Sequence, residues 1–173
     1  MTYSIGFRLP ARGELARELL ARTADEAPEA LGDMAYRDPG QPAVSRPAEV
    51  PAAMLDFARD TVERALREPE QLAMALGEVL TEPKPNVWFD PLPEDAGCEI
   101  GGAVELDRRT RMMYDARHIF INGESYRASG RDARLMRALA DDRQLGEREV
   151  AGLSADARDL LGQWKEAGWL HEA

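Results

Sequence analysis

A proline-rich stretch divides this chain into two dissimilar parts. Residues 81–91 read TEPKPNVWFDP, in which three prolines surround an aromatic pair. Proline lacks the backbone N–H that a helix interior or a central strand requires, so neither element is expected to continue through this stretch. Helical patterns with proline-rich connections precede it, and short β-like runs follow it. We therefore expect residues 81–91 to be a hinge between two architectures.

Helical periodicity dominates the part before the hinge. Apolar residues recur at one-turn spacing in residues 12–22, 51–67 and 69–80, and a less regular helical segment covers 25–35. A proline opens the helices at 51 and 69, a position where its missing N–H is tolerated. Four prolines and a glycine in residues 36–51 predict an extended connector on the surface.

These helices have more apolar surface than one small core can cover. The expected stripes are Leu15, Leu19 and Leu20; Met54, Ala58, Val62, Ala65 and Leu66; and Leu72, Leu76, Val79 and Leu80. No long hydrophobic strand lies between them to build a shared core. A partner surface is therefore expected, most simply a second copy of the chain.

The part after the hinge contains the elements of a winged helix. Short strands are expected over 102–107 and 111–114, and a hairpin over 118–127. The Asn122-Gly123 pair in the hairpin fits a type I′ turn, in which both central residues have positive φ. Three short helices follow the hairpin, so the strands come first. We therefore expect a mainly helical α+β fold.

Capping residues mark the ends of those three helices. Ser129 and Ser154 are placed to cap the first and third, and residues 146–153 form the second. Gly168 occupies the position of a helix C-terminal glycine. Leu135, Met136 and Leu139 face inward on the first helix, and Ala157, Leu160, Leu161 and Trp164 on the third.

The first ten residues, MTYSIGFRLP, alternate apolar and polar side chains before Pro10 ends the run. This pattern predicts a strand without a visible partner before residue 102. It is either the last strand of a sheet whose other strands are absent, or an edge strand or ordered tail. Periodicity does not choose between these interpretations.

Charge and composition exclude several classes of protein. The formal charge is −10, with 9 basic and 15 acidic residues in 1–83 and 13 and 17 in 84–173. Neither part has the basic excess typical of non-specific nucleic-acid binding. No apolar run approaches the roughly 20 residues of a membrane span, and no signal segment opens the chain, so a cytoplasmic protein is expected. The single Cys98 excludes an internal disulfide and a multi-cysteine zinc cluster.

Catalytic motifs are absent from the sequence. The two histidines, His118 and His171, lack H-x-D or H-x-x-x-H spacing, so a half-exposed strand histidine and a tail histidine are expected rather than a metal centre. No nucleophile-elbow or phosphate-loop motif occurs. No catalytic or metal-binding residue is assigned.

Two further groups of residues have a functional and an ordinary interpretation. Arg131, Arg134 and Arg137 repeat every three residues and could face a phosphate backbone, but interleaved aspartates favour a solvated helix face. Trp88 and Phe89 in the hinge could anchor a ligand, but such a pair more often fixes one subdomain to another.

Several stretches resemble one enzyme family. They are YSIGFRLP at 3–10, AYRDPGQPAVSRPAEVP at 35–51, LTEPKP at 80–85 and INGE at 121–124. They are similar to the C-terminal part of bacterial JmjC/cupin-type ribosomal oxygenases. Enzymes of this family depend on Fe(II) and 2-oxoglutarate and hydroxylate an arginine of a large-subunit ribosomal protein. The C-terminal hydrophobic pattern, which ends in AGWLH at 167–171, fits the same resemblance.

The resemblance implies three regions and an incomplete enzyme. Residues 1–10 would be the last strand of a truncated cupin barrel, 11–83 a helical dimerisation region and 84–173 a winged-helix domain. The iron ligands of the family, H-x-D…H, precede the matching strand, and nothing in this chain replaces them. Thr2 and Ser4, which alternate onto one side of that strand, would line a cosubstrate pocket only in the complete barrel; their ordinary role is hydrogen bonding along a strand.

Two functions are therefore expected as alternatives. In the first, the chain is the dimerising, winged-helix C-terminal portion of a ribosomal oxygenase, inactive alone, whose complete form acts on a ribosomal protein. In the second, it is a stand-alone dimeric adaptor whose winged helix binds protein or, less favoured by the charge, nucleic acid.

Overall fold

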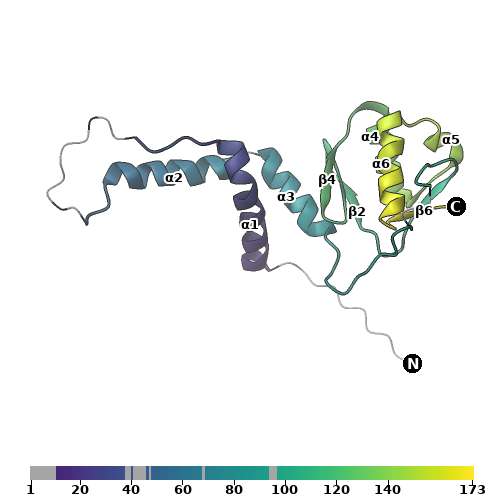
Figure 1. Ribbon diagram of the computed structural model, residues 1–173, viewed down its shortest axis with the longest axis horizontal. Coiled ribbons are helices and arrows are strands. Elements are labelled where there is room, and N and C mark those ends of the chain that lie inside the picture. Colours follow the sequence, from purple (N-terminus) through teal and green to yellow (C-terminus); the bar gives the residue numbers. More distant parts are fainter. Residues whose placement is uncertain (1–10, 38–39, 41–45, 47, 68, 94–96) are drawn as a thin grey trace, which may run out of the picture. The chain divides into compact units, whose positions relative to one another are not determined.

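The computed structural model describes the chain except residues 1–10, 38–39, 41–45, 47, 68 and 94–96 (Figure 1). The chain forms two compact units, Met1–Ala75 and Leu76–Ala173, which divide within the third helix. The strand expected over 1–10 and much of the connector over 36–51 lie outside the described residues. No helix in the described part is long and apolar enough to cross a membrane.

Helix α1 (Arg12–Leu31) is one continuous helix of 20 residues, so the expectation of two segments was wrong. Residues 23–26 contain no helix breaker, which allows the helix to continue. Pro28 lies inside the last turn, and its carbonyl accepts a hydrogen bond from the Gly32 N–H. Gly32, with φ of 67°, then ends the helix.

The next two helices have the expected extents within one or two residues. Helix α2 (Ala52–Arg67) begins just after Pro51, whose carbonyl accepts from the amides of Met54 and Leu55. Tyr36 and Phe57 make an edge-to-face contact with ring centroids 5.5 Å apart. Helix α3 (Pro69–Thr81) follows.

The hairpin is formed as expected and belongs to a three-stranded antiparallel sheet in the order β2-β3-β4. The strands are β2 (Met112–Tyr114), β3 (His118–Ile121) and β4 (Glu124–Arg127). Asn122 and Gly123 have φ of 48° and 93°, as a type I′ turn requires. All four residues of β3 are buried, so this strand is covered on both faces.

A second antiparallel sheet has the order β5-β1-β6. Its central strand β1 (Val104–Leu106) pairs with β5 (Gln144–Leu145) and with β6 (Leu170–Glu172). Strands β5 and β6 were not expected from the sequence, because runs of two and three residues show no alternation. The sheet joins segments that lie far apart in the chain, since β1 precedes all three C-terminal helices.

The three C-terminal helices are α4 (Gly130–Asp142), α5 (Glu147–Val150) and α6 (Ala155–Glu166), and they gather beside the two sheets (Figure 1). The Ser154 hydroxyl accepts from the Ala157 N–H and caps α6. Ser129 occupies the N-cap position of α4 without a side-chain cap bond, so the expected capping was wrong there. Gly168, with φ of 73°, follows α6.

One hydrophobic core joins both sheets and the three helices. Trp164 of α6 is its largest fully buried side chain, and the edge of its ring meets Tyr126 of β4 at 5.5 Å between centroids. The fully buried aliphatic residues around it are Val104, Leu106, Ile119, Ile121, Leu139, Leu145, Leu161 and Leu170. Burial of each contributes on the order of 1.5–3 kcal/mol of hydrophobic free energy.

The C-terminal half of α3 packs on the hairpin. Gly77 faces the ring of Phe120, and the fully buried Thr81 accepts a hydrogen bond from the Gly123 N–H through Oγ1 at 3.1 Å. Ser125 donates to Oε1 of Glu78 at 2.6 Å. These contacts make the end of α3 part of the C-terminal unit.

Candidate functional site

Helix α2 presents an apolar face that no described residue covers. Leu55, Val62 and Leu66 lie on one side of the helix, because they are separated by seven and four residues, and their exposed fractions are 55%, 60% and 45%. No residue of α2 is buried. We call these three residues the α2 apolar face. A helix with an exposed stripe of this kind is typical of an interaction surface.

The side of α2 that faces the rest of its unit is different. Phe57 meets Tyr36, and Thr61 donates a hydrogen bond to the Phe57 carbonyl within the helix. Phe57, Thr61 and Ala65 are partly buried and share one side of the helix. The expected stripe, which included Ala65 with Val62 and Leu66, is therefore divided between an inner and an outer face.

The part of helix α3 that belongs to the C-terminal unit also has an inner, packed face and an outer, exposed face. Gly77 and Thr81 lie against the hairpin, whereas Leu76 and Leu80 have exposed fractions of 37% and 38%. Leu76 and Leu80 are one helical turn apart and lie on the same face. This second apolar surface is also free of described neighbours that would bury it.

The outer surface of α6, the third helix of the winged-helix unit, is acidic. Asp156, Asp159 and Glu166 are exposed, while Leu161 and Trp164 point into the core. In DNA-binding helix-turn-helix proteins the corresponding helix enters the major groove and contacts phosphates and base edges. Carboxylates on that surface oppose approach to a polyanion.

Phe89 in the hinge is anchored to the winged-helix unit. Its ring contacts Trp169 edge to face at 6.3 Å between centroids, and the Arg109 guanidinium lies 5.5 Å from its centroid. The Leu92 N–H donates to the Glu166 carbonyl at 2.8 Å. Phe89 therefore pins the hinge to its own unit. Trp88 next to it is 76% exposed and remains the candidate for a ligand or partner contact.

Asp107 and Arg109 form the strongest charged network of the unit. Arg109 donates to Asp107 through Nε at 2.8 Å, to Asp90 through Nη2 at 2.9 Å and to the Trp88 carbonyl through Nη1 at 2.7 Å. The hydrogen bonds from Arg109 hold the pKa of Asp107 far below its usual range, with His171 adding to the effect. The same bonds raise the pKa of Arg109. This arrangement fixes the hinge and engages the carboxylates of both Asp107 and Asp90.

The two histidines do not form a common site. His118 is 4% exposed, so the expectation of a half-exposed residue was wrong; its Nδ1 lies 3.1 Å from Asp115 Oδ2 and its ring packs against Phe120. His171 is exposed, with Nε2 at 3.2 Å from Asp107 Oδ2. The residues therefore stand on different sheets with different acidic partners.

These side chains do not fit an iron centre. Among the residues that the structure describes, no group of three His, Cys, Asp or Glu side chains is placed to hold a metal ion. The Asp107 carboxylate near His171 already accepts hydrogen bonds from Arg109. Thr2 and Ser4, the candidates for a cosubstrate pocket, lie outside the described residues. Cys98 is a free, partly buried cysteine.

The three arginines of α4, Arg131, Arg134 and Arg137, do not all face the same surface. Arg131 turns towards Gly152, because a β-carbon built on Gly152 would lie 2.2 Å from Arg131 Nη2. Arg134 and Arg137 instead line a pocket to which Arg117 and Arg127 also contribute. The sequence offered only the three-residue spacing as a signal, since the other two arginines lie on the hairpin sheet.

Comparison with known proteins gives one family and one fold. The family model described as ROXA-like winged helix matches residues 59–171. No curated protein sequence matches the chain.

Solved structures with the same fold come from Escherichia coli. The X-ray structure of ycfD is 22% identical, with a TM-score of 0.71, and the match covers 96% of this chain and 46% of that chain. The ribosomal oxygenase YcfD is 20% identical, with a TM-score of 0.71, over 96% and 47%. YcfD in complex with cobalt and 2-oxoglutarate is 21% identical, with a TM-score of 0.72, over 96% and 47%. The chain thus spans less than half the length of these structures.

Proposed function

Because this chain belongs to the ROXA-like winged-helix family, we propose that it is the C-terminal region of an Fe(II)- and 2-oxoglutarate-dependent oxygenase whose complete form hydroxylates a ribosomal protein. The family match over residues 59–171 carries this proposal. The YcfD structures support it, since they are described as a ribosomal oxygenase and as a complex with 2-oxoglutarate. An arginine side chain is the substrate residue that the sequence resemblance favours.

Dimerisation is the first role that we assign to the chain. The α2 apolar face exposes Leu55, Val62 and Leu66, and burying one such side chain stabilises a complex by roughly 1.5–3 kcal/mol. A second copy of the same chain offers the same face, and a two-fold axis makes such a contact self-complementary. The occupant of the α2 apolar face is therefore a second copy.

A winged-helix contact with protein is the second role. The exposed acidic residues of α6 disfavour a phosphate backbone and suit a basic partner, as ribosomal proteins are expected to be. A ribosomal substrate also places the proposed enzyme in the cytoplasm. Titration with duplex DNA at low and moderate salt tests this role, and salt-sensitive binding would contradict it.

We do not assign the iron chemistry of the complete enzyme to the residues of this chain. The described histidines have acidic partners that suit structural roles, and none of the described residues fits the metal. Nor do we assign it to residues 1–10, which the sequence relates to a barrel strand without iron ligands. The chain by itself is therefore proposed to be inactive.

Two measurements on the purified chain test the proposal. Light scattering should give a mass of about 38 kDa, twice the 19.2 kDa of the chain, because of the proposed dimer. Incubation with Fe(II), 2-oxoglutarate and a ribosomal-protein extract should yield no succinate above a control without protein. A monomer at micromolar concentration would remove the dimerisation role, and succinate formation would contradict inactivity.

A further inference from the structure

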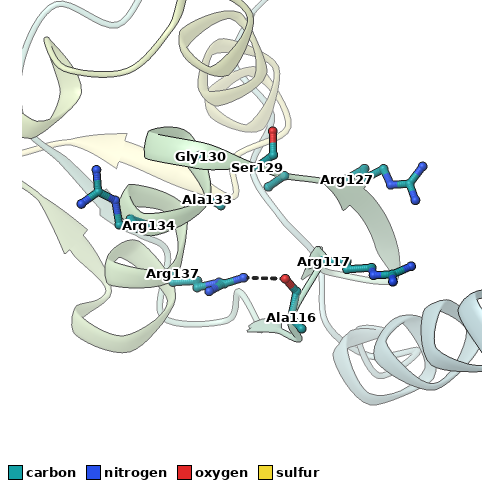
Figure 2. Close-up of a pocket in the computed structure, with 9 residues that line it drawn as sticks. Ala116, Arg117, Arg127, Ser129, Gly130, Ala133, Arg134 and Arg137 are labelled. Atoms are coloured by element: carbon teal, nitrogen blue, oxygen red, sulfur yellow. Dashed lines mark hydrogen bonds between the residues drawn. The ribbon is translucent and has the colours of Figure 1, made fainter.

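A pocket of about 650 Å³ lies at the N-terminal end of α4 and is lined by four arginines, Arg117, Arg127, Arg134 and Arg137 (Figure 2). No Asp or Glu is among the residues that line it. In a chain of net charge −10, a cavity whose charged lining is entirely basic is an exception to the general composition. Its walls therefore suit an anion.

Helix α4 begins at this pocket without its usual caps. Ser129 makes no side-chain cap bond, although it is at the N-cap position. Asp132, the acidic residue of the first turn, is turned away and accepts from the Ser154 N–H at 3.0 Å and the Ser154 hydroxyl at 2.7 Å. The first-turn amides of α4 thus lack a side-chain acceptor, and such amides favour an oxyanion.

Arg137 provides a second and independent observation. One of its guanidinium nitrogens, Nη2, donates to the Ala116 carbonyl at 2.9 Å, which holds the side chain across the pocket wall (Figure 2). Its guanidinium also lies 5.5 Å from the centre of the Tyr114 ring. These two contacts fix the guanidinium at the pocket wall, where its positive charge favours an anion.

Arg134 adds an adaptable charge on the same helix. It is exposed, and Figure 2 shows it extending from α4 in a different direction from Arg137. Rotation about its long side chain allows it to close over a ligand held at the helix N-terminus. Arg117 and Arg127 have other interactions within the chain, so the argument rests on Arg134, Arg137 and the amides of α4.

We propose that this pocket binds a phosphate group of a compact ligand, held by the N-terminal amides of α4 and by Arg134 and Arg137. Arginine and helix N-termini are both suited to the tetrahedral oxygens of phosphate. A long nucleic-acid strand is disfavoured, because Asp141 and Asp142 are exposed farther along the same helix and Asp156 is exposed on α6. The ligand is therefore a free or monoesterified phosphate rather than a polymer.

The test is an NMR titration of the full chain with inorganic pyrophosphate at constant ionic strength, with sodium chloride as reference. The backbone amides of Gly130 and Arg131 should shift saturably in pyrophosphate and not in chloride. Arg134→Gln should weaken binding about tenfold, the effect of one charge-assisted hydrogen bond. Arg148→Gln is the matched control, since Arg148 is exposed on α5 and outside the pocket lining, and should bind as the wild type.

Other outcomes decide against the proposal. Shifts that grow linearly with pyrophosphate, or equal weakening by Arg148→Gln and Arg134→Gln, would overturn it. A short single-stranded RNA that binds with a steep salt dependence while pyrophosphate does not would overturn it in favour of nucleic acid. Among the described residues, Arg134 has no hydrogen bond or ion pair whose loss should unfold the chain, and thermal denaturation of both variants checks that they are folded. A failed pyrophosphate titration leaves the dimerisation and oxygenase proposals untouched.

Discussion

A β-carbon on Gly77 would lie 2.4 Å from the aromatic ring of Phe120. Gly77 is in the middle of α3, and Phe120 is in the central strand of the hairpin sheet. The helix backbone therefore rests directly on the ring, which is possible only because residue 77 has no side chain. This contact and the Thr81–Gly123 hydrogen bond together fix the end of α3 on the hairpin.

Gly77→Ala should lower the free energy of unfolding by about 1–3 kcal/mol, because the added methyl group overpacks the interface. The usual helix preference for Ala over Gly, about 1 kcal/mol, acts in the opposite direction and should not compensate. Urea denaturation measures the change. Gly13→Ala in α1, where a β-carbon meets nothing within 4 Å, is the control and should not destabilise. Phe120→Leu should recover part of the loss in the Gly77→Ala background.

Gly168→Ala should destabilise the winged-helix unit more than Gly32→Ala destabilises α1. Both glycines end helices with positive φ, 73° and 67°, so Ala costs about 1–2 kcal/mol at either position. A β-carbon at Gly168 would also lie 2.4 Å from the Asp90 carbonyl oxygen, whereas one at Gly32 meets nothing within 4 Å. Thermal denaturation of both variants gives the comparison. Equal losses would show that the hinge does not pass against Gly168.

Val62→Glu should convert the proposed dimer into a monomer, since a charge in the centre of the α2 apolar face would be buried without a partner. Ala53→Glu is the matched control: residue 53 is exposed and nine positions away, which places it on the opposite side of the helix. Light scattering at micromolar concentration should give the mass of one chain for Val62→Glu and of two for Ala53→Glu. A dimer that survives Val62→Glu must use another surface.

Asp107→Asn should make the chain less stable at neutral pH by about 1.5–3 kcal/mol, the range for hydrogen bonds to charged groups. The pKa of Asp107 is lowered in the folded state, chiefly by its hydrogen bond from Arg109. Its stabilising effect is therefore complete above the unfolded pKa of about 3.9 and is lost as the pH falls towards the folded pKa.

The difference between Asp107→Asn and the wild type should accordingly narrow below about pH 4. Denaturant titrations at neutral and acidic pH measure it. Asp159→Asn, on the exposed surface of α6, is the control and should have little effect at either pH. A difference that stays constant with pH would mean that the Asp107–Arg109 bond does not contribute to stability.

Local signals in the sequence predicted most of the helices and the hairpin. The Asn122-Gly123 step specifies its turn because few other pairs tolerate positive φ twice, and Ser154 caps α6 through its own hydroxyl. The apolar stripe of α2 was visible, but not which residues face outward, because that depends on where Phe57 meets Tyr36. The continuity of α1 through residues 23–26 was missed, because Thr23, Asp25 and Glu26 interrupt the apolar one-turn spacing there.

Features built from distant residues could not be predicted. Strands β5 and β6 have two or three residues and exist because β1 offers both of its edges. The burial of His118 follows from cover on both faces of β3, which alternation alone does not indicate. The arginine pocket draws on three segments, so only its α4 part was visible as a periodic row. The domain boundary placed at residue 83 and the barrel strand at 1–10 stay predictions.

The hairpin turn also bears on how this protein ages. Asparagine followed by glycine is chemically fragile, because the glycine nitrogen can attack the asparagine side-chain carbonyl and release ammonia. Here the Gly123 N–H is held by Thr81 Oγ1 at 3.1 Å, and the Asn122 side-chain oxygen accepts from the Arg111 N–H at 3.0 Å. Ring closure requires the Gly123 nitrogen to leave Thr81 and the Asn122 side chain to rotate towards it. Isoaspartate at position 122 would thus accumulate only in molecules that have opened, which makes it a chemical record of unfolding.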